Sequence, residues 1–279
     1  MEVDEFHYQL EWRANTSHPG HHRSHQTGSG FEFRGHTSIL RAPDPRRFDA
    51  LASLRDPFEQ IQVRTYNQRS AVSVCAVADL SASMGFEGRC RKLDVLADFV
   101  ASLGYSAYRT GDRFAFFGCD SQILSEFFVP LNRTKASGPE VARRLHEYRP
   151  TGNNSSGLLD AAQYLPKLRS LVFLCSDFYF PPSLLTQILT ALSAHSVVPV
   201  VLWDSAEIEV PPRGIALVRD PESGVRRTLW LRPALRERIR SAHRERRETL
   251  DKCFVSHGLR ALHLIDRFDP ERATQYFYG

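Results

Sequence analysis

Oxygen-bearing side chains follow two apolar runs of this chain, at the positions where buried strands would end. An Asp-x-Ser-x-Ser motif follows the run 71–78 and a Ser-Asp pair follows the run 171–175; the residues are Asp79, Ser81, Ser83, Ser176 and Asp177. A third polar stretch, the Gly-containing loop 151–157, adds Asn154 and Ser155. Carboxylate, hydroxyl and amide oxygens without a neighbouring Cys or His ligand are hard donors. Such a set suits Mg²⁺ or Mn²⁺ better than zinc or copper.

The apolar runs before these residues predict buried strands, because they are short, rich in β-branched residues and uncharged. Helical spacing follows over 92–109, and a strand at 113–120 turns tightly into an antiparallel neighbour at 122–131. This alternation predicts an α/β fold with a doubly wound, mostly parallel, Rossmann-like sheet and one antiparallel strand. Because parallel strands end at one sheet edge, where open α/β sheets bind ligands, we expect the three polar stretches to converge on one cation.

Residues 1–70 differ from the rest of the chain and are predicted to form an N-terminal extension. The stretch 18–30 is polar and rich in Gly and His, which predicts a loop, and a short helical pattern covers 44–53. Residues 71–279 are predicted to form the α/β domain, with a hairpin insertion at 206–231.

The composition, 42% hydrophobic and 24% charged residues, is ordinary for a globular protein with a sizeable core. No apolar stretch approaches the roughly 20 residues that cross a bilayer, and the acidic N-terminus lacks the apolar region of a signal peptide. We therefore expect a cytoplasmic protein with no membrane partner. The five cysteines are scattered, which indicates small buried side chains rather than disulfides or a zinc site.

The charge pattern argues against nucleic acid as the partner. A formal charge of +4 over 279 residues makes a weak field, and only four of the 36 cationic residues are lysines. The basic helix predicted over 233–257 interleaves its arginines with glutamates, which is typical of a solvated helix. Its apolar stripe, predicted to face the core, consists of Leu235, Ile239, Ala242 and Leu250.

The Asp-x-Ser-x-Ser motif, the hydroxyl-rich loop and the Ser-Asp pair together resemble the metal-ion-dependent adhesion site of von Willebrand factor type A domains. The resemblance covers roughly residues 71–205 and implies a fold of that architecture. It also implies a set of metal ligands: Ser81 and Ser83 directly, Asp79 and Asp177 directly or through water, and either Asn154 or Ser155 at the place of the family's second-loop threonine.

A second resemblance precedes the motif. The segments 22–24, 28–33, 44–49 and 63–66 are similar, in that order, to bacterial proteins with the domain of unknown function 58. Members of that family often occur beside MoxR-type AAA+ ATPases. In adhesion sites of this kind the ion keeps one coordination position for an Asp or Glu of a protein partner. The resemblance therefore implies a Mg²⁺-dependent protein–protein interaction module, and an adaptor of a MoxR-type ATPase rather than an enzyme.

The alternative is a Mg²⁺-dependent phosphoester hydrolase, because Asp79 stands where such enzymes place a nucleophilic carboxylate. Those enzymes usually carry a second carboxylate two residues on, and here that residue is Ser81. The chain contains no P-loop, no G-x-S-x-G elbow and no H-E-x-x-H motif. The remaining candidate for a general base is Asp204, after another predicted strand. An arginine-mediated nucleic-acid binder is the third hypothesis.

Overall fold

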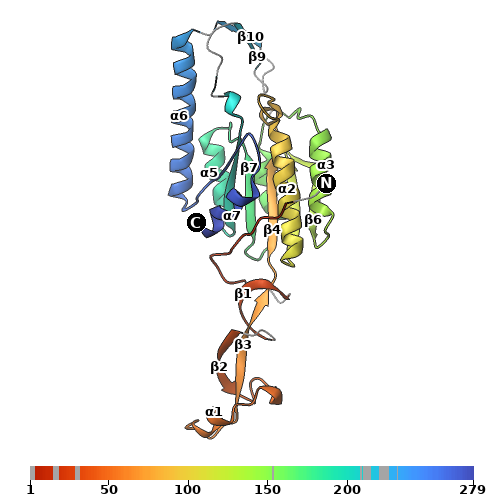
Figure 1. The fold of residues 1–279 in the computed structure, drawn as a ribbon, viewed down its shortest axis with the longest axis vertical. Helices are drawn as coiled ribbons and strands as arrows, with labels where there is room; N and C mark the ends of the chain where they lie inside the picture. Colours follow the sequence, from red (N-terminus) through yellow and green to blue (C-terminus); the bar gives the residue numbers. More distant parts are fainter. Residues whose placement is uncertain are drawn as a thin grey trace. The chain divides into compact units, whose positions relative to one another are not determined.

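The computed structural model describes residues 4–14, 19–28, 32–152, 154–207, 209, 215–219, 226–230 and 232–279. The chain divides into two compact units, which Figure 1 draws as a ribbon. The larger unit contains Ser73–Gly279 together with the first eight residues, and the smaller one spans Gln9–Val72.

A six-stranded sheet forms the centre of the larger unit. Its strands run in the order β11, β8, β7, β4, β5, β6, and all neighbours pair in parallel except β5 and β6. The strands are β4 (Ser73–Asp79), β5 (Arg113–Cys119), β6 (Ile123–Asn132), β7 (Leu171–Ser176), β8 (Ser196–Trp203) and β11 (Leu262–Ile265). This confirms the predicted α/β class, including the single antiparallel strand.

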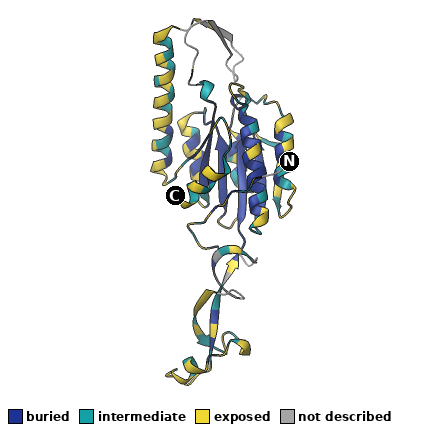
Figure 2. Ribbon diagram, viewed as in Figure 1, coloured by how far each residue is buried: buried dark blue, intermediate teal, exposed yellow. Residues whose placement is uncertain are grey.

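Helices cover both faces of this sheet, which explains why its central strands are apolar throughout. Every residue of β4 and β7 is buried, and Figure 2 shows the buried strands between helices with exposed outer faces. The helices are α2 (Lys92–Arg109), α3 (Ser137–Glu147), α4 (Gly157–Asp160), α5 (Pro182–Ala191), α6 (Pro233–Ser256) and α7 (Pro270–Tyr278). A Cβ on Gly104 of α2 would lie 2.6 Å from the Cα of Gly138, so these glycines let α2 and α3 cross closely.

The first described residues pack on the sheet rather than with the extension that we predicted over 1–70. The ring of Phe6 is buried and lies 5.9 Å from that of Phe99 and 6.4 Å from that of Phe173. Because this aromatic cluster belongs to the sheet face under α2 and α7, residues 4–8 are part of the larger unit. The separate unit accordingly begins at Gln9.

The smaller unit holds a three-stranded antiparallel sheet in the order β1, β3, β2, with one short helix. Its elements are β1 (Pro19–Gly28), β2 (Glu32–Ser38), the 3-10 helix η1 (Pro45–Arg47), α1 (Ala50–Leu54) and β3 (Gln62–Ser70). The loop prediction for 18–30 is therefore wrong over the described part of that stretch. A strand forms there because the backbone of β3 pairs with it, and a polar sequence carries no sign of that pairing.

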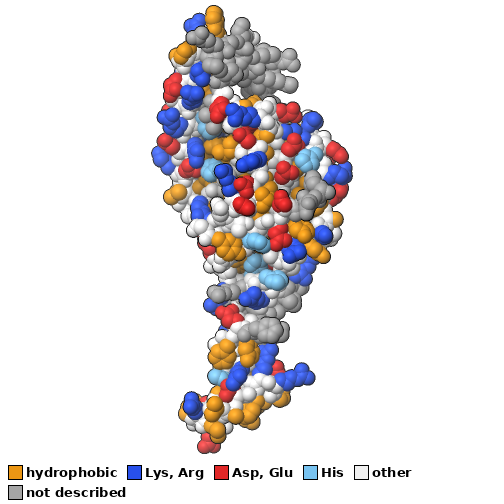
Figure 3. All heavy atoms as spheres, viewed as in Figure 1, with side chains coloured by type: hydrophobic (Ala, Val, Ile, Leu, Met, Phe, Trp, Pro, Cys, Tyr) orange, Lys and Arg blue, Asp and Glu red, His pale blue; other side chains and the backbone are white. Residues whose placement is uncertain are grey.

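Several large apolar side chains of the smaller unit face solvent. Leu40, Leu51, Leu54 and Phe58 are between 67% and 87% exposed, and we call these four the apolar patch residues. Figure 3 shows hydrophobic side chains gathered at the end of the unit that carries α1. Asp49 caps that helix by accepting from the Ala52 N–H at 3.0 Å, and it also pairs with Arg64 at 2.7 Å.

The region after β8 contains the predicted hairpin, β9 (Ile215–Arg219) and β10 (Arg226–Trp230), whose turn at 220–224 lies outside the described residues. The long helix α6 buries Leu250 and Phe254. The predicted core stripe is wrong at Ala242, which is exposed, because the neighbouring His243 is the residue that packs toward the sheet, with its ring 4.5 Å from that of Trp203 in β8. Among the helices of the described residues, none is long and apolar enough to span a membrane.

Candidate metal centre

Asp79 lies at the carboxyl end of β4, the strand between β5 and β7, and is fully buried. Its Oδ1 accepts a hydrogen bond from the Ser81 N–H at 3.0 Å. Its Oδ2 accepts from two hydroxyls, Ser155 Oγ at 2.9 Å and Ser176 Oγ at 2.7 Å. These donors come from all three polar stretches that the sequence placed at one sheet edge. The structure therefore gathers the predicted stretches around a single carboxylate.

The first and second loops are joined by backbone contacts. Ser81 forms a parallel bridge with Gly152, and the Ala82 N–H donates to the Gly152 carbonyl at 2.8 Å. A Cβ on Gly152 would lie 2.4 Å from the Cβ of Asp120, so only glycine permits this close approach. In the first loop, the hydroxyls of Ser81 and Ser83 lie 3.2 Å apart.

The second loop presents Ser155 to the cluster and turns Asn154 away from it. Ser155 is buried and bonds Asp79, as described above. Asn154 is exposed, and its Oδ1 accepts from the N–H and the hydroxyl of Ser156, at 3.1 and 2.7 Å. Of the two alternatives that the sequence left open, Ser155 is therefore the one brought to Asp79.

Asp177 follows β7 and is also fully buried. Its Oδ1 accepts from the Tyr179 N–H at 3.1 Å, and its Oδ2 accepts from the ammonium of Lys92 at 2.9 Å. Lys92 is the first residue of α2, and its Nζ also lies 2.7 Å from Glu207 Oε1. The backbone carbonyl of Asp177 is held by the indole N–H of Trp203 at 3.0 Å.

Lys92 and Glu207 are the residues of this cluster that sequence reasoning missed. The helical spacing over 92–109 predicts only that Lys92 begins a helix. A lysine at a helix N-terminus is electrostatically unfavourable, because the helix dipole is positive there. Lysine is rare in this chain, with only four in the sequence, so a lysine at this unfavourable position could have indicated a buried acidic partner.

The electrostatics of Asp79 favour a cation beside it. Burial first, and then the negative charge of Asp177, raise the pKa of Asp79 from the ordinary 3.8 to about 6, although the bonds from Ser81 and Ser176 act to lower it. For Lys92, burial acts to lower the pKa, but the charges of Asp177 and Glu207 outweigh it, so the net shift is upward. The lysine thus compensates Asp177, while Asp79 has hydroxyls and a backbone N–H as its bonded partners.

The donor set around Asp79 fits a hard divalent ion. It consists of carboxylate and hydroxyl oxygens on three loops: Asp79, Ser81, Ser83, Ser155, Ser176 and Asp177. Oxygen ligands of this kind are those of Mg²⁺ and Mn²⁺. The raised pKa means that burial and the charge of Asp177 disfavour the ionised form of Asp79, and a divalent ion would favour that form.

Comparison with known proteins identifies the family. A family model described as "Protein of unknown function DUF58" matches residues 45–249, most of the chain. The chain belongs to the DUF58 family. An uncharacterized protein in the moxR 3′ region of Paracoccus denitrificans is 39% identical over 99 residues, which is 35% of this chain and 94% of that protein. The uncharacterized protein Rv1480 of Mycobacterium tuberculosis is 23% identical over 236 residues, 82% of this chain and 69% of that protein.

Among solved structures, this DUF58 chain is similar to the conserved hypothetical protein BatB from Bacteroides thetaiotaomicron. The sequence identity is 10% and the TM-score 0.42, with 74% of this chain and 95% of that chain covered.

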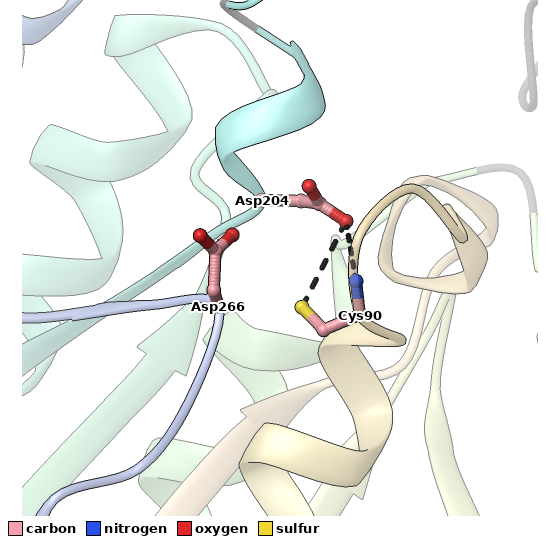
Figure 4. Close-up of side chains that lie close together, drawn as sticks. All are labelled: Cys90, Asp204 and Asp266. Carbon is pink, nitrogen blue, oxygen red and sulfur yellow. Dashed lines mark hydrogen bonds between the residues drawn. The ribbon is translucent and has the colours of Figure 1, made fainter.

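A second group of possible ligand atoms in this DUF58 protein belongs to Cys90, Asp204 and Asp266, within 4.8 Å of one another (Figure 4). Asp204 is buried and accepts from backbone N–H groups of Gly88, Arg89 and Cys90 at 3.0 to 3.2 Å. Burial acts to raise the pKa of Asp204, but the bond from the Ala206 N–H and these three bonds outweigh it, so the net shift is downward. Asp204 therefore anchors the loop before α2.

Proposed function

We propose that this DUF58 protein is a protein-interaction module that depends on a divalent cation, Mg²⁺ or Mn²⁺. Asp79, Ser81, Ser83 and Ser155 would hold the ion, with Asp177 beside it. The observation that carries the proposal is the buried Asp79 carboxylate. It accepts hydrogen bonds from the hydroxyls of Ser155 and Ser176, which lie on two other loops, and its pKa is raised to about 6. Mg²⁺ usually keeps several waters, so an Asp or Glu of a partner could replace one of them.

The contacts favour binding over hydrolysis. Both oxygens of Asp79 accept hydrogen bonds, and the position two residues on, where such hydrolases usually carry a second carboxylate, is Ser81. Asp204, the sequence candidate for a general base, has its two oxygens bonded by backbone N–H groups. These arrangements support a site that holds an ion rather than one that turns over a phosphoester.

The partner that we propose is a MoxR-type AAA+ ATPase. The Paracoccus denitrificans relative is named for its place in the moxR 3′ region, and we extend that association to this chain. The apolar patch residues of the smaller unit support an interaction role, because exposed apolar sets of this kind often mark binding surfaces.

Calorimetric titration with Mn²⁺ and Mg²⁺ tests the metal site. The wild type is expected to bind one ion, and Asp79→Ala and Ser81→Ala are expected to bind at least about tenfold more weakly, because even the loss of a residue that only supports a metal ligand costs about that much. Asn154→Ala is the matched control, because Asn154 lies in the same loop but bonds Ser156 instead of Asp79. Equal affinity in all four proteins would refute the metal site.

Two further measurements address the function. Capture of a purified MoxR-type ATPase from the same organism should require Mg²⁺ and be lost in EDTA. Turnover of p-nitrophenyl phosphate by the wild type and not by Asp79→Asn would instead establish the hydrolase and overturn the interaction proposal.

A further inference from the structure

Lys92 places a positive charge inside the candidate metal centre. Its ammonium lies 2.9 Å from Asp177 Oδ2 and 2.7 Å from Glu207 Oε1. The side chain is 1% exposed, Asp177 is 0% exposed and Glu207 14%. The rings of Tyr179 and Phe86 lie 5.1 and 5.5 Å from the ammonium, within the range of cation–π contact. The two carboxylates and the two rings therefore form a preformed cation-binding site, and the ammonium of Lys92 is the cation that it binds.

The lysine limits what Asp177 can offer to a metal. Both oxygens of Asp177 are engaged, one by the Tyr179 N–H and the other by Lys92. A divalent ion at Asp79 that also took Asp177 Oδ2 would share this oxygen with the ammonium, whose positive charge repels the ion. Lys92 is not free to leave, because a buried charge that loses its partner is strongly destabilising. The ion and the lysine therefore compete for one carboxylate.

We infer that Lys92 is a positioning residue that keeps the divalent-ion affinity of this centre low by holding Asp177 in an internal ion pair. The inference rests on the proposed metal site and deepens it. Removing the lysine would release a carboxylate oxygen and also remove a repelling charge. Together these changes correspond to roughly 10- to 100-fold tighter metal binding at the effective dielectric of protein sites.

A weakly held ion has a consequence for the partner. If the centre binds the ion poorly alone, a carboxylate that a partner adds to the coordination shell raises the ion's affinity, and the ion raises the partner's affinity by the same factor. Lys92 thus makes ion capture and partner capture depend on one another. In a variant without the lysine, the ion would bind without the partner.

The test is a Mn²⁺ titration of the full chain, with free Mn²⁺ followed by electron paramagnetic resonance. Lys92→Met is expected to bind Mn²⁺ at least about tenfold more tightly than the wild type. Two control variants are expected to show no gain in Mn²⁺ affinity. Lys92→Arg keeps the positive charge, and Glu207→Gln keeps the Lys92–Asp177 pair. Lys92→Met binding no tighter than the wild type would overturn the inference. A purely structural role of Lys92 predicts weaker binding, not tighter.

The double variant Lys92→Met/Glu207→Gln covers the case in which Lys92→Met does not fold, because it leaves fewer unpaired carboxylates. The double variant is also expected to bind Mn²⁺ at least about tenfold more tightly than the wild type. If it does not, the inference is refuted in the same way. Asp79→Asn separates the two hypotheses. Loss of Mn²⁺ binding in Asp79→Asn with no gain in the lysine variants refutes the role of Lys92 alone. Equal binding by the wild type and Asp79→Asn refutes the metal site itself.

Discussion

Replacing Asp79 by Asn should stabilise the metal-free protein at neutral pH. The carboxylate is fully buried near Asp177, and its pKa is raised from 3.8 to about 6. The folded state therefore binds more protons than the unfolded state between these two values, so wild-type stability falls as the pH rises through that window. Above pH 6 the folded protein holds an ionised carboxylate that burial disfavours. An asparagine at this position has no charge to bury.

The size of the effect follows from the pKa shift. A shift of about two units corresponds to about 3 kcal/mol, because each unit is worth about 1.4 kcal/mol. The asparagine keeps an oxygen for the Ser81 N–H, and the hydroxyls of Ser155 and Ser176 can turn to accept from its amide. We therefore expect a gain of up to about 3 kcal/mol at pH 7.5, with little difference at pH 4. For a protein of this size that is an increase in Tm of roughly 6 to 12 °C.

Urea unfolding in EDTA at pH 4 and pH 7.5 measures this difference. Asp120→Asn, the same chemical change at a partly exposed carboxylate just after β5, is the matched control and should give no gain that depends on pH. In Mg²⁺ the advantage of Asp79→Asn should shrink, because the wild type gains the free energy of ion binding and Asp79→Asn does not. An asparagine variant less stable than the wild type in EDTA at pH 7.5 would refute the reasoning about the buried charge.

Three further changes test single contacts. Ser155→Ala should weaken Mn²⁺ binding about tenfold in a calorimetric titration, whereas Asn154→Ala should leave it unchanged; the opposite result would make Asn154 the ligand. Asp204→Ala leaves the backbone N–H groups of the loop before α2 without an acceptor, so urea unfolding should show a loss of about 3 kcal/mol or more. Gly104→Ala places a Cβ 2.6 Å from the Cα of Gly138 and should lower the free energy of unfolding by about 1–3 kcal/mol; a neutral result would contradict the close helix crossing.

Most of the fold could be predicted because its signals are local. The uncharged apolar runs became β4 and β7, and the helical spacing after residue 92 became α2. The sequence-based predictions fail where a contact with a residue distant in the chain decides the local structure. The strand β1 exists through pairing with β3, and in α6 the side chain that packs on β8 is His243 rather than Ala242 of the predicted stripe. Neither fact leaves a periodic pattern in the chain.

The same division holds at the candidate metal centre. Which chemistry is available follows from the residue order, because a carboxylate and hydroxyls that follow strands of a parallel sheet must meet at one edge. The tertiary structure decided which of those groups meet Asp79. The bridge from Ser81 to Gly152 sets the second loop so that Ser155, and not Asn154, enters the cluster. Only the folded chain brings Lys92 and Glu207 to Asp177, since residues 85 and 30 positions away become neighbours through packing rather than through any local pattern.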